Sequence, residues 1–124
     1  MNERAMTPAD GALVQVTLVV SPAVSDAVID WLLQQPMIQG FSSHDGMGHG
    51  HDPQQLTVTE QVAGCQPRTF FSAIVPHAAL AAFLEGLRAD LAGMEVHYWA
   101  TPVLAHGRLD DAAASADPSR DAGP

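Results

Sequence analysis

The chain has 124 residues, 47% of them hydrophobic and 15% charged, so it can form one folded domain and is too apolar to be disordered throughout. Fourteen acidic residues stand against five arginines and no lysine, and the resulting net charge of −9 excludes nucleic acids and anionic membranes as partners. Short apolar runs, the lack of a secretory signal and a single cysteine, Cys65, predict a cytoplasmic protein without a membrane-inserted segment.

The two ends of the chain differ in composition from its middle. Residues 1–11 are polar and show no periodicity, and residues 110–124 contain mainly alanine, aspartate, serine, proline and glycine. Such segments bury too little apolar surface to offset the entropy lost on folding, so we expect disordered tails, the second one acidic. One domain is therefore predicted over residues 12–109.

This domain begins with a strand and a helix. Leu13–Val20 is rich in β-branched residues and partly alternates, which is typical of a buried strand. Ser21 and Pro22 then form a helix-start signal, and Pro36 ends the helix. The apolar stripe of this helix consists of Val24, Val28, Trp31 and Leu32, widened by Ile29 and Leu33.

The middle of the domain is predicted to hold a glycine-rich loop between strands. Met37–His44 is a short strand-like run, and the loop follows over His44–Asp52. Leu56–Val62 alternates with the period of a strand, and Arg68–Val75 follows after a turn. We expect these last two segments to pair as a hairpin.

A second helix and a last strand complete the domain. The helix begins at Pro76 and stops at Gly93, and Met94–Leu104 forms the strand. The apolar stripe of this second helix repeats at i, i+3, i+4, i+7 and i+11 and consists of Leu80, Phe83, Leu84, Leu87 and Leu91.

The order of these elements predicts an α+β fold, the ferredoxin-like β-α-β-β-α-β sandwich, in which both helices pack on one face of an antiparallel sheet. The other face of the sheet would be uncovered. We expect Val19, Phe70 or Phe71, Tyr98 and Trp99 to line it. An exposed apolar face on so small a domain indicates burial in an oligomer.

Several short motifs in this order resemble a known family. They are Gly40-Phe41, Gly48–His51, Glu60–Gly64, Tyr98–Val103 and Gly107. In these motifs the chain is similar to an uncharacterised PII-like family often encoded beside heavy-metal efflux pumps. More broadly, the element order over residues 12–108 resembles the PII-like superfamily, which includes the PII signalling proteins and the CutA proteins.

The resemblance implies a homotrimer whose sheets face inward. It also implies a mobile loop between the second and third strands that touches partners, with nucleotides bound between subunits near that loop. Arg68, Arg108 and Gly64 would be the nucleotide-contacting residues here, and His106 could belong to the same anion cleft. PII phosphate clefts use several basic side chains, and this chain offers few, so we expect a nucleotide less than a metal.

The predicted loop also has the composition of a metal site. Imidazole suits zinc, copper and nickel, and the carboxylates and the Met47 thioether of the loop add hard and soft ligands. His49 and His51 flank one glycine, so both rings could reach one ion. The alternative is an exposed glycine- and histidine-rich loop without a metal role. The candidate ligands are His44, Asp45, His49, His51 and Asp52, with Cys65 as a soft ligand joining the loop.

Enzymatic activity is not expected. The sequence has none of the common nucleophile, phosphate-loop or zinc-protease motifs. Cys65 has Arg68 nearby, but the sequence places no general base beside it. The glutamates of the chain are scattered and suggest no catalytic pair of carboxylates. His97 is expected on the sheet surface as an ordinary strand residue.

Composition, element order and resemblance together favour a small regulatory or sensor protein. Its His/Gly-rich loop would bind a divalent transition metal and signal to a partner, such as a membrane efflux pump or its regulator. Two alternatives remain at this point: a PII-like nucleotide-binding signalling protein, and a passive metal-binding module.

Overall fold

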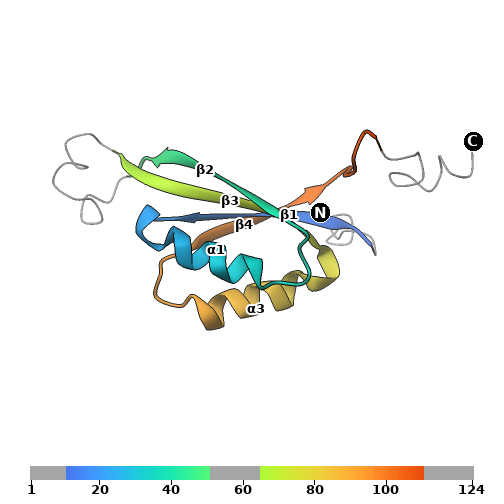
Figure 1. Ribbon diagram of the computed structural model, residues 1–124, viewed down its shortest axis with the longest axis horizontal. Helices are drawn as coiled ribbons and strands as arrows, with labels where there is room; N and C mark the ends of the chain where they lie inside the picture. Colours follow the sequence, from blue (N-terminus) through green and yellow to red (C-terminus); the bar gives the residue numbers. More distant parts are fainter. Residues whose placement is uncertain (1–10, 51–64, 111–124) are drawn as a thin grey trace, which may run out of the picture.

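Four antiparallel strands form one sheet, and two helices cover one of its faces (Figure 1). The computed structural model describes residues 11–50 and 65–110. The strands lie in the order β2-β3-β1-β4, which confirms the predicted ferredoxin-like α+β fold. The elements are β1 (Leu13–Val20), η2 (Pro22–Val24), α1 (Ser25–Leu33), β2 (Phe41–Gly48), β3 (Gln66–Pro76), η4 (His77–Ala79), α3 (Leu80–Asp90) and β4 (His97–Val103).

The core lies between the sheet and the helices. Alternate residues of β1 and β3 point toward the helices and are buried, because side chains of a strand alternate between its two faces. These core residues are Val14, Val16, Leu18 and Val20 of β1 and Phe71, Ala73 and Val75 of β3.

The first helix starts and ends close to the predicted positions. Ser21 Oγ accepts a hydrogen bond from the Ala23 backbone N–H (3.3 Å), and Pro22 opens a 3-10 turn that leads into α1. Val28, Trp31 and Leu32 are buried as the stripe predicted. Leu33 was expected to widen that stripe, which is wrong, since it lies at the solvent side of the last turn and is 69% exposed.

The second helix is fixed to the first through Trp31. Its ring meets Phe83 edge-on, with centroids 5.2 Å apart, and its Nε1–H donates to Asp90 Oδ2 (2.8 Å). A Cβ atom at Gly86 would stand 3.3 Å from the Trp31 ring, so a glycine allows the two helices to approach closely here. After α3, Gly93 has φ +85°, the left-handed conformation that glycine tolerates at a helix end.

The segment before residue 50 differs from the prediction. Phe41–Gly48 forms strand β2, so the predicted loop does not begin at His44. β2 and β1 occupy the two sides of β3, and the expected hairpin partner of Arg68–Val75 was therefore wrong. Leu56–Val62 lies outside the described residues. The predicted strand-like run Met37–His44 overlaps only the first half of β2. The edge position explains why the second half was expected to be a loop: β2 has little buried surface, so polar residues and glycine are tolerated there and no alternation reveals the strand.

Neither predicted tail can be compared with the structure, because residues 1–10 and 111–124 lie outside the described part of the chain. Within the described residues, no helix has the length and apolarity that a membrane span requires.

Candidate functional site

One face of the sheet carries no helix. Strand register defines this surface, which we call the open face: Ser42 and His44 of β2, Arg68, Phe70, Ser72 and Ile74 of β3, Leu13, Gln15, Thr17 and Val19 of β1, and His97, Trp99, Thr101 and Val103 of β4. The Gln15 Nε2–H donates to Ser72 Oγ (2.7 Å) across this surface.

The aromatic residues of the open face were only partly predicted. Val19, Phe70 and Trp99 lie on it as expected, and Trp99 is 49% exposed. Phe71 is instead buried against the helices. Tyr98 pairs with the buried Leu18 and therefore points to the helical side, where its hydroxyl accepts from Arg88. The prediction for Tyr98 was wrong because consecutive strand residues face opposite ways and the register was unknown.

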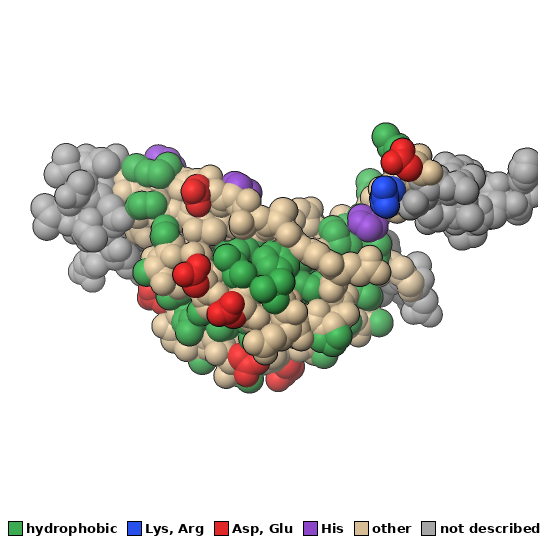
Figure 2. Space-filling model, in the orientation of Figure 1, with side chains coloured by type: hydrophobic (Ala, Val, Ile, Leu, Met, Phe, Trp, Pro, Cys, Tyr) green, Lys and Arg blue, Asp and Glu red, His purple; other side chains and the backbone are tan. Residues whose placement is uncertain are grey.

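The charges of the molecule are distributed unevenly over the two sides. None of the described residues on the open face is acidic, and its titratable or charged groups are Arg68, His44 and His97. Figure 2 shows most of the acidic side chains in view over the helices, whereas the histidines lie along the sheet side, where fewer acidic side chains are seen. Two copies of this acidic chain can therefore meet through their open faces without bringing carboxylates of those faces close together.

His44 lies against Phe70 on the open face. The two rings are parallel within 8° and their centroids are 4.9 Å apart. A Cβ atom at Gly46 would stand 2.7 Å from the Phe70 ring, so glycine at this position leaves room for the ring to lie across β2. The sequence motif around His44 thus serves strand packing.

The structure does not gather the predicted metal ligands into one site. His44 and Asp45 are consecutive strand residues and point to opposite faces of the sheet. His49 follows the end of β2 and is exposed, and half-buried Cys65 precedes β3. No group of three or more potential ligands occurs in residues 11–50 and 65–110. His51, Asp52 and Gly64 lie outside those ranges, so metal binding there stays a prediction.

The β2–β3 ladder ends at a defined pair. Gly48, the last residue of β2, is the register partner of Gln66, the first residue of β3. The chain therefore leaves the sheet after Gly48 and re-enters it at Gln66, two positions that a two-residue turn could have joined. A Cβ atom at Gly48 would be 3.1 Å from Arg68 Cγ, so the stem of Arg68 packs against the residue where this segment begins.

A cleft lies at the other end of the sheet. It has a volume of about 610 Å³ and is lined by Leu13, Met37, Gln39, Gly40, Ile74, Pro76, His106, Gly107 and Arg108. Arg108 is exposed and lies 3.7 Å from Asp110. His106 and Arg108 both line this cleft, and the binding of an anion there stays a prediction. Met37 and Gln39 were missed, because a link between helix and strand gives no pattern that marks a lining residue.

Arg68 and Arg108 lie at opposite ends of the sheet. Arg68 precedes Thr69, which pairs with Val20 at the end of β1. Arg108 follows Val103, which pairs with Leu13 at the start of β1. The eight residues of β1 separate these ends by about 26 Å. One small ligand cannot touch both arginines of a single chain.

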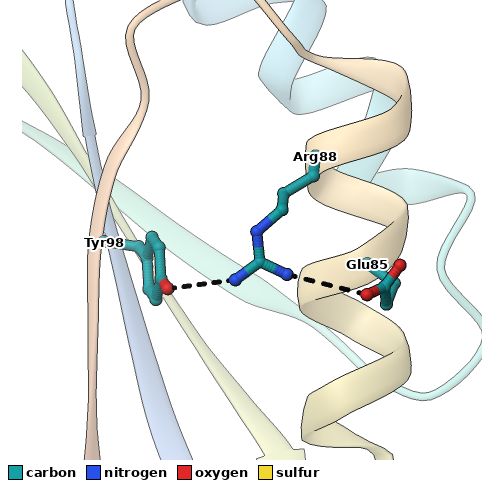
Figure 3. A network of polar contacts seen from close by, with 3 residues as sticks. All are labelled: Glu85, Arg88 and Tyr98. Carbon is teal, nitrogen blue, oxygen red and sulfur yellow. Dashed lines mark hydrogen bonds and ion pairs between the residues drawn. The ribbon is translucent and has the colours of Figure 1, made fainter.

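A smaller cavity of about 360 Å³ lies between α3 and β4. Leucine side chains form much of its lining, and Arg88 stands at its rim, donating to the Tyr98 hydroxyl (3.4 Å) and lying 3.9 Å from Glu85 (Figure 3). Arg88 and Glu85 are both largely exposed, so this network is weak.

Residues 11–110 match the family model described as "Protein of unknown function (DUF3240)". Among curated proteins, none matches the chain. One structure with the same fold is a DUF3240 family protein from Shewanella baltica OS155, with 22% identity and a TM-score of 0.65 over 78% of this chain and 96% of that chain.

Two PII-like structures share the fold as well. CPII from Thiomonas intermedia K12, a nitrogen regulatory PII-like protein bound to ADP, AMP and bicarbonate, has 16% identity and a TM-score of 0.58 over 78% of this chain and 94% of its own. The B. subtilis GlnK–ATP complex has 12% identity and a TM-score of 0.59 over 80% and 88%. These likenesses establish that the chain has the fold of these PII-like proteins, as the sequence predicted.

Proposed function

The chain belongs to the DUF3240 family of proteins of unknown function, and a solved member of this family from Shewanella baltica has the same fold. We propose that the chain is a PII-like regulatory protein. In this proposal copies of the chain assemble through the open face, an adenine nucleotide binds between them, and residues 49–65 pass its presence on to a partner. The protein acts in the cytoplasm, by binding and not by catalysis.

The packing of Arg68 on Gly48 is the observation that carries this proposal. A phosphate held by the Arg68 guanidinium would fix the side chain whose stem touches the first residue before the 49–65 segment. Ligand binding at that point would change which conformations of the segment are populated, and a partner could recognise the difference.

The arrangement of the two arginines supports a ligand shared between copies. Both are candidates for phosphate contacts, yet they lie at opposite ends of the sheet in one chain. A neighbouring copy could place its Arg108 end beside the Arg68 end of the first. CPII and GlnK, which share this fold, are described with bound ADP and AMP and with ATP, respectively.

The open face supports self-association. It combines exposed apolar surface, including Trp99, with the lack of any acidic side chain among its described residues. On a chain with a net charge of −9, contact through this face avoids the repulsion that other surfaces would bring. A trimer with inward-facing sheets would bury it.

Calorimetry with ATP, ADP and AMP tests the nucleotide. Wild type is expected to show saturable binding, whereas Arg68→Ala and Arg108→Ala each weaken it; Arg88→Ala, on the helical side, is the matched control. An equimolar mixture of the Arg68→Ala and Arg108→Ala chains, assembled together, should recover part of the binding, because some junctions then hold both arginines. No saturable heat with wild type would refute the nucleotide.

Hydrogen exchange tests the output. With saturating nucleotide, amide protection of residues 49–65 should change while that of β1 stays constant. Unchanged exchange in residues 49–65 would contradict a signalling role. The protein would then bind the nucleotide without passing its presence on to a partner.

A second candidate ligand is a divalent transition metal on His49, His51 and Asp52, which follow one another closely in the sequence. Zinc, copper or nickel bound there would order the same segment, and a metal-efflux pump or its regulator would be the partner. Calorimetry with each metal on wild type and on a His49→Ala/His51→Ala variant tests this candidate. Equal heats from both proteins would remove it.

A further inference from the structure

The cavity between α3 and β4 lies on the helical side of the sheet, away from the open face. Its volume of about 360 Å³ is at the small end of the range of ligand pockets, so it suits a small molecule. Positions i, i+3, i+4 and i+7 share one face of a helix, and here they form one wall of the cavity: Leu84, Leu87, Arg88 and Leu91. Val96 and Tyr98 line it from β4 and the link before that strand.

Arg88 has hydrogen-bond donors to spare at the rim of this cavity. Its guanidinium donates to the Tyr98 hydroxyl over a long 3.4 Å and stands 3.9 Å from a Glu85 carboxylate oxygen (Figure 3). A guanidinium carries five N–H groups and binds a carboxylate best through two of them at once. The pair with Glu85 is exposed and weak, so a ligand carboxylate can displace it at little cost.

Glu95 lines the same cavity and carries the opposite charge. Among the residues that the structure describes, it is the only one other than glycine with a positive φ, +55°. This conformation is costly for a residue with a side chain, and such residues gather at functional sites. Within the same part of the chain, no ion pair or side-chain hydrogen bond involves the Glu95 carboxylate. It is therefore available to a cationic group of a ligand.

We propose that this cavity binds an apolar α-amino acid such as leucine, isoleucine or methionine. Arg88 and the Tyr98 hydroxyl hold its carboxylate, and Glu95 holds its ammonium group. The three leucines of the wall and Val96 pack on its side chain. A simple anion fits less well, because Glu85 and Glu95 outnumber Arg88 around the cavity and the whole chain is acidic. An amino acid brings no net charge and meets a partner of each sign.

This site needs only one copy of the chain. Its residues belong to α3, β4 and the link between them, and none of them lies among the open-face residues or in the cleft with Arg108. Amino-acid binding is therefore independent of the nucleotide and of self-association, and the failure of either would leave it standing. It gives the proposed regulatory protein a second ligand.

Chemical-shift titration of the ¹⁵N-labelled full chain with L-leucine tests the proposal. Saturable shifts are expected in the amides of residues 84–98 and not in those of β2. Arg88→Ala and Glu95→Gln should each weaken binding about tenfold or more, because each leaves one charge of the ligand without its partner. Both side chains are exposed, so the variants are expected to fold, and circular dichroism checks this. Asp30→Asn, an exposed carboxylate outside the cavity, is the matched control and should bind leucine as wild type does.

Three analogues of leucine separate the parts of the site. 4-Methylpentanoate lacks the amino group, 3-methylbutylamine lacks the carboxylate and glycine lacks the side chain, and each should bind about tenfold or more weakly than leucine. A lack of saturable shifts with leucine, isoleucine and methionine would overturn the proposal, and so would leucine binding that Arg88→Ala leaves unchanged. If 4-methylpentanoate binds as tightly as leucine and Glu95→Gln changes nothing, the cavity takes a carboxylate alone and the amino acid is refuted.

Discussion

The ring of Phe70 lies parallel to that of His44 and passes over the backbone of Gly46, where a Cβ atom would come within 2.7 Å of it. Two residues of the glycine- and histidine-rich motif, His44 and Gly46, are thus packed against Phe70 of β3 on the open face. This relationship turns a segment that looks like a flexible metal loop into an ordered edge strand.

Gly46→Ala is expected to displace the Phe70 ring and lower the free energy of unfolding by about 1 kcal/mol, because an added methyl group must overlap the ring or move it. Urea unfolding measures the loss. Gly40→Ala is the control, since its Cβ would meet no atom within 4 Å, and it should change the free energy by less than about 0.5 kcal/mol. Equal stabilities of the two variants would contradict the close contact.

The contact between the helices through Trp31 and Asp90 gives a second prediction. Asp90→Ala removes the acceptor of the indole N–H and should cost about 1 kcal/mol of unfolding free energy. In Trp31→Phe the donor is already absent, so adding Asp90→Ala should cost little more; the double-mutant cycle isolates the pair. Asp30→Ala, an exposed carboxylate on α1, is the control. Additive losses would show that the two side chains do not interact.

The network around Arg88 should matter little for stability. Its contacts to Glu85 and Tyr98 are long, and the two charged side chains are 61% and 80% exposed, so solvent screens the attraction. Arg88→Ala is expected to change the free energy of unfolding by less than about 0.5 kcal/mol, measured by urea titration. A loss above about 1 kcal/mol would mean that Arg88 ties α3 to β4.

Elements with a strong apolar period were predictable from the sequence. β1 and the two helices carry such patterns, because each buries one side against the same core. β2 does not, since an edge strand with two largely exposed faces places few constraints on its residues. The candidate metal loop therefore extended too far toward His44, into residues that the β3 ladder orders.

The open face illustrates a different limit. The existence of this face follows from the packing of two helices on one side of a four-stranded sheet. Which residues lie on it depends on the strand register, because a shift of one residue moves every side chain to the other face. Phe70 and Phe71 are identical neighbours, and Tyr98 and Trp99 are both aromatic, so only strand pairing assigns one of each pair to the open face.

The open face as the place where copies of this chain meet is the claim on which the shared ligand site depends. Light scattering should give a molar mass of several chains for wild type. Trp99→Glu puts a carboxylate on that face and should give a folded monomer by circular dichroism, whereas Leu33→Glu replaces an equally apolar but helical-side residue that is 69% exposed and should leave the mass unchanged. A monomeric wild type, or a Trp99→Glu variant that assembles like Leu33→Glu, would contradict it.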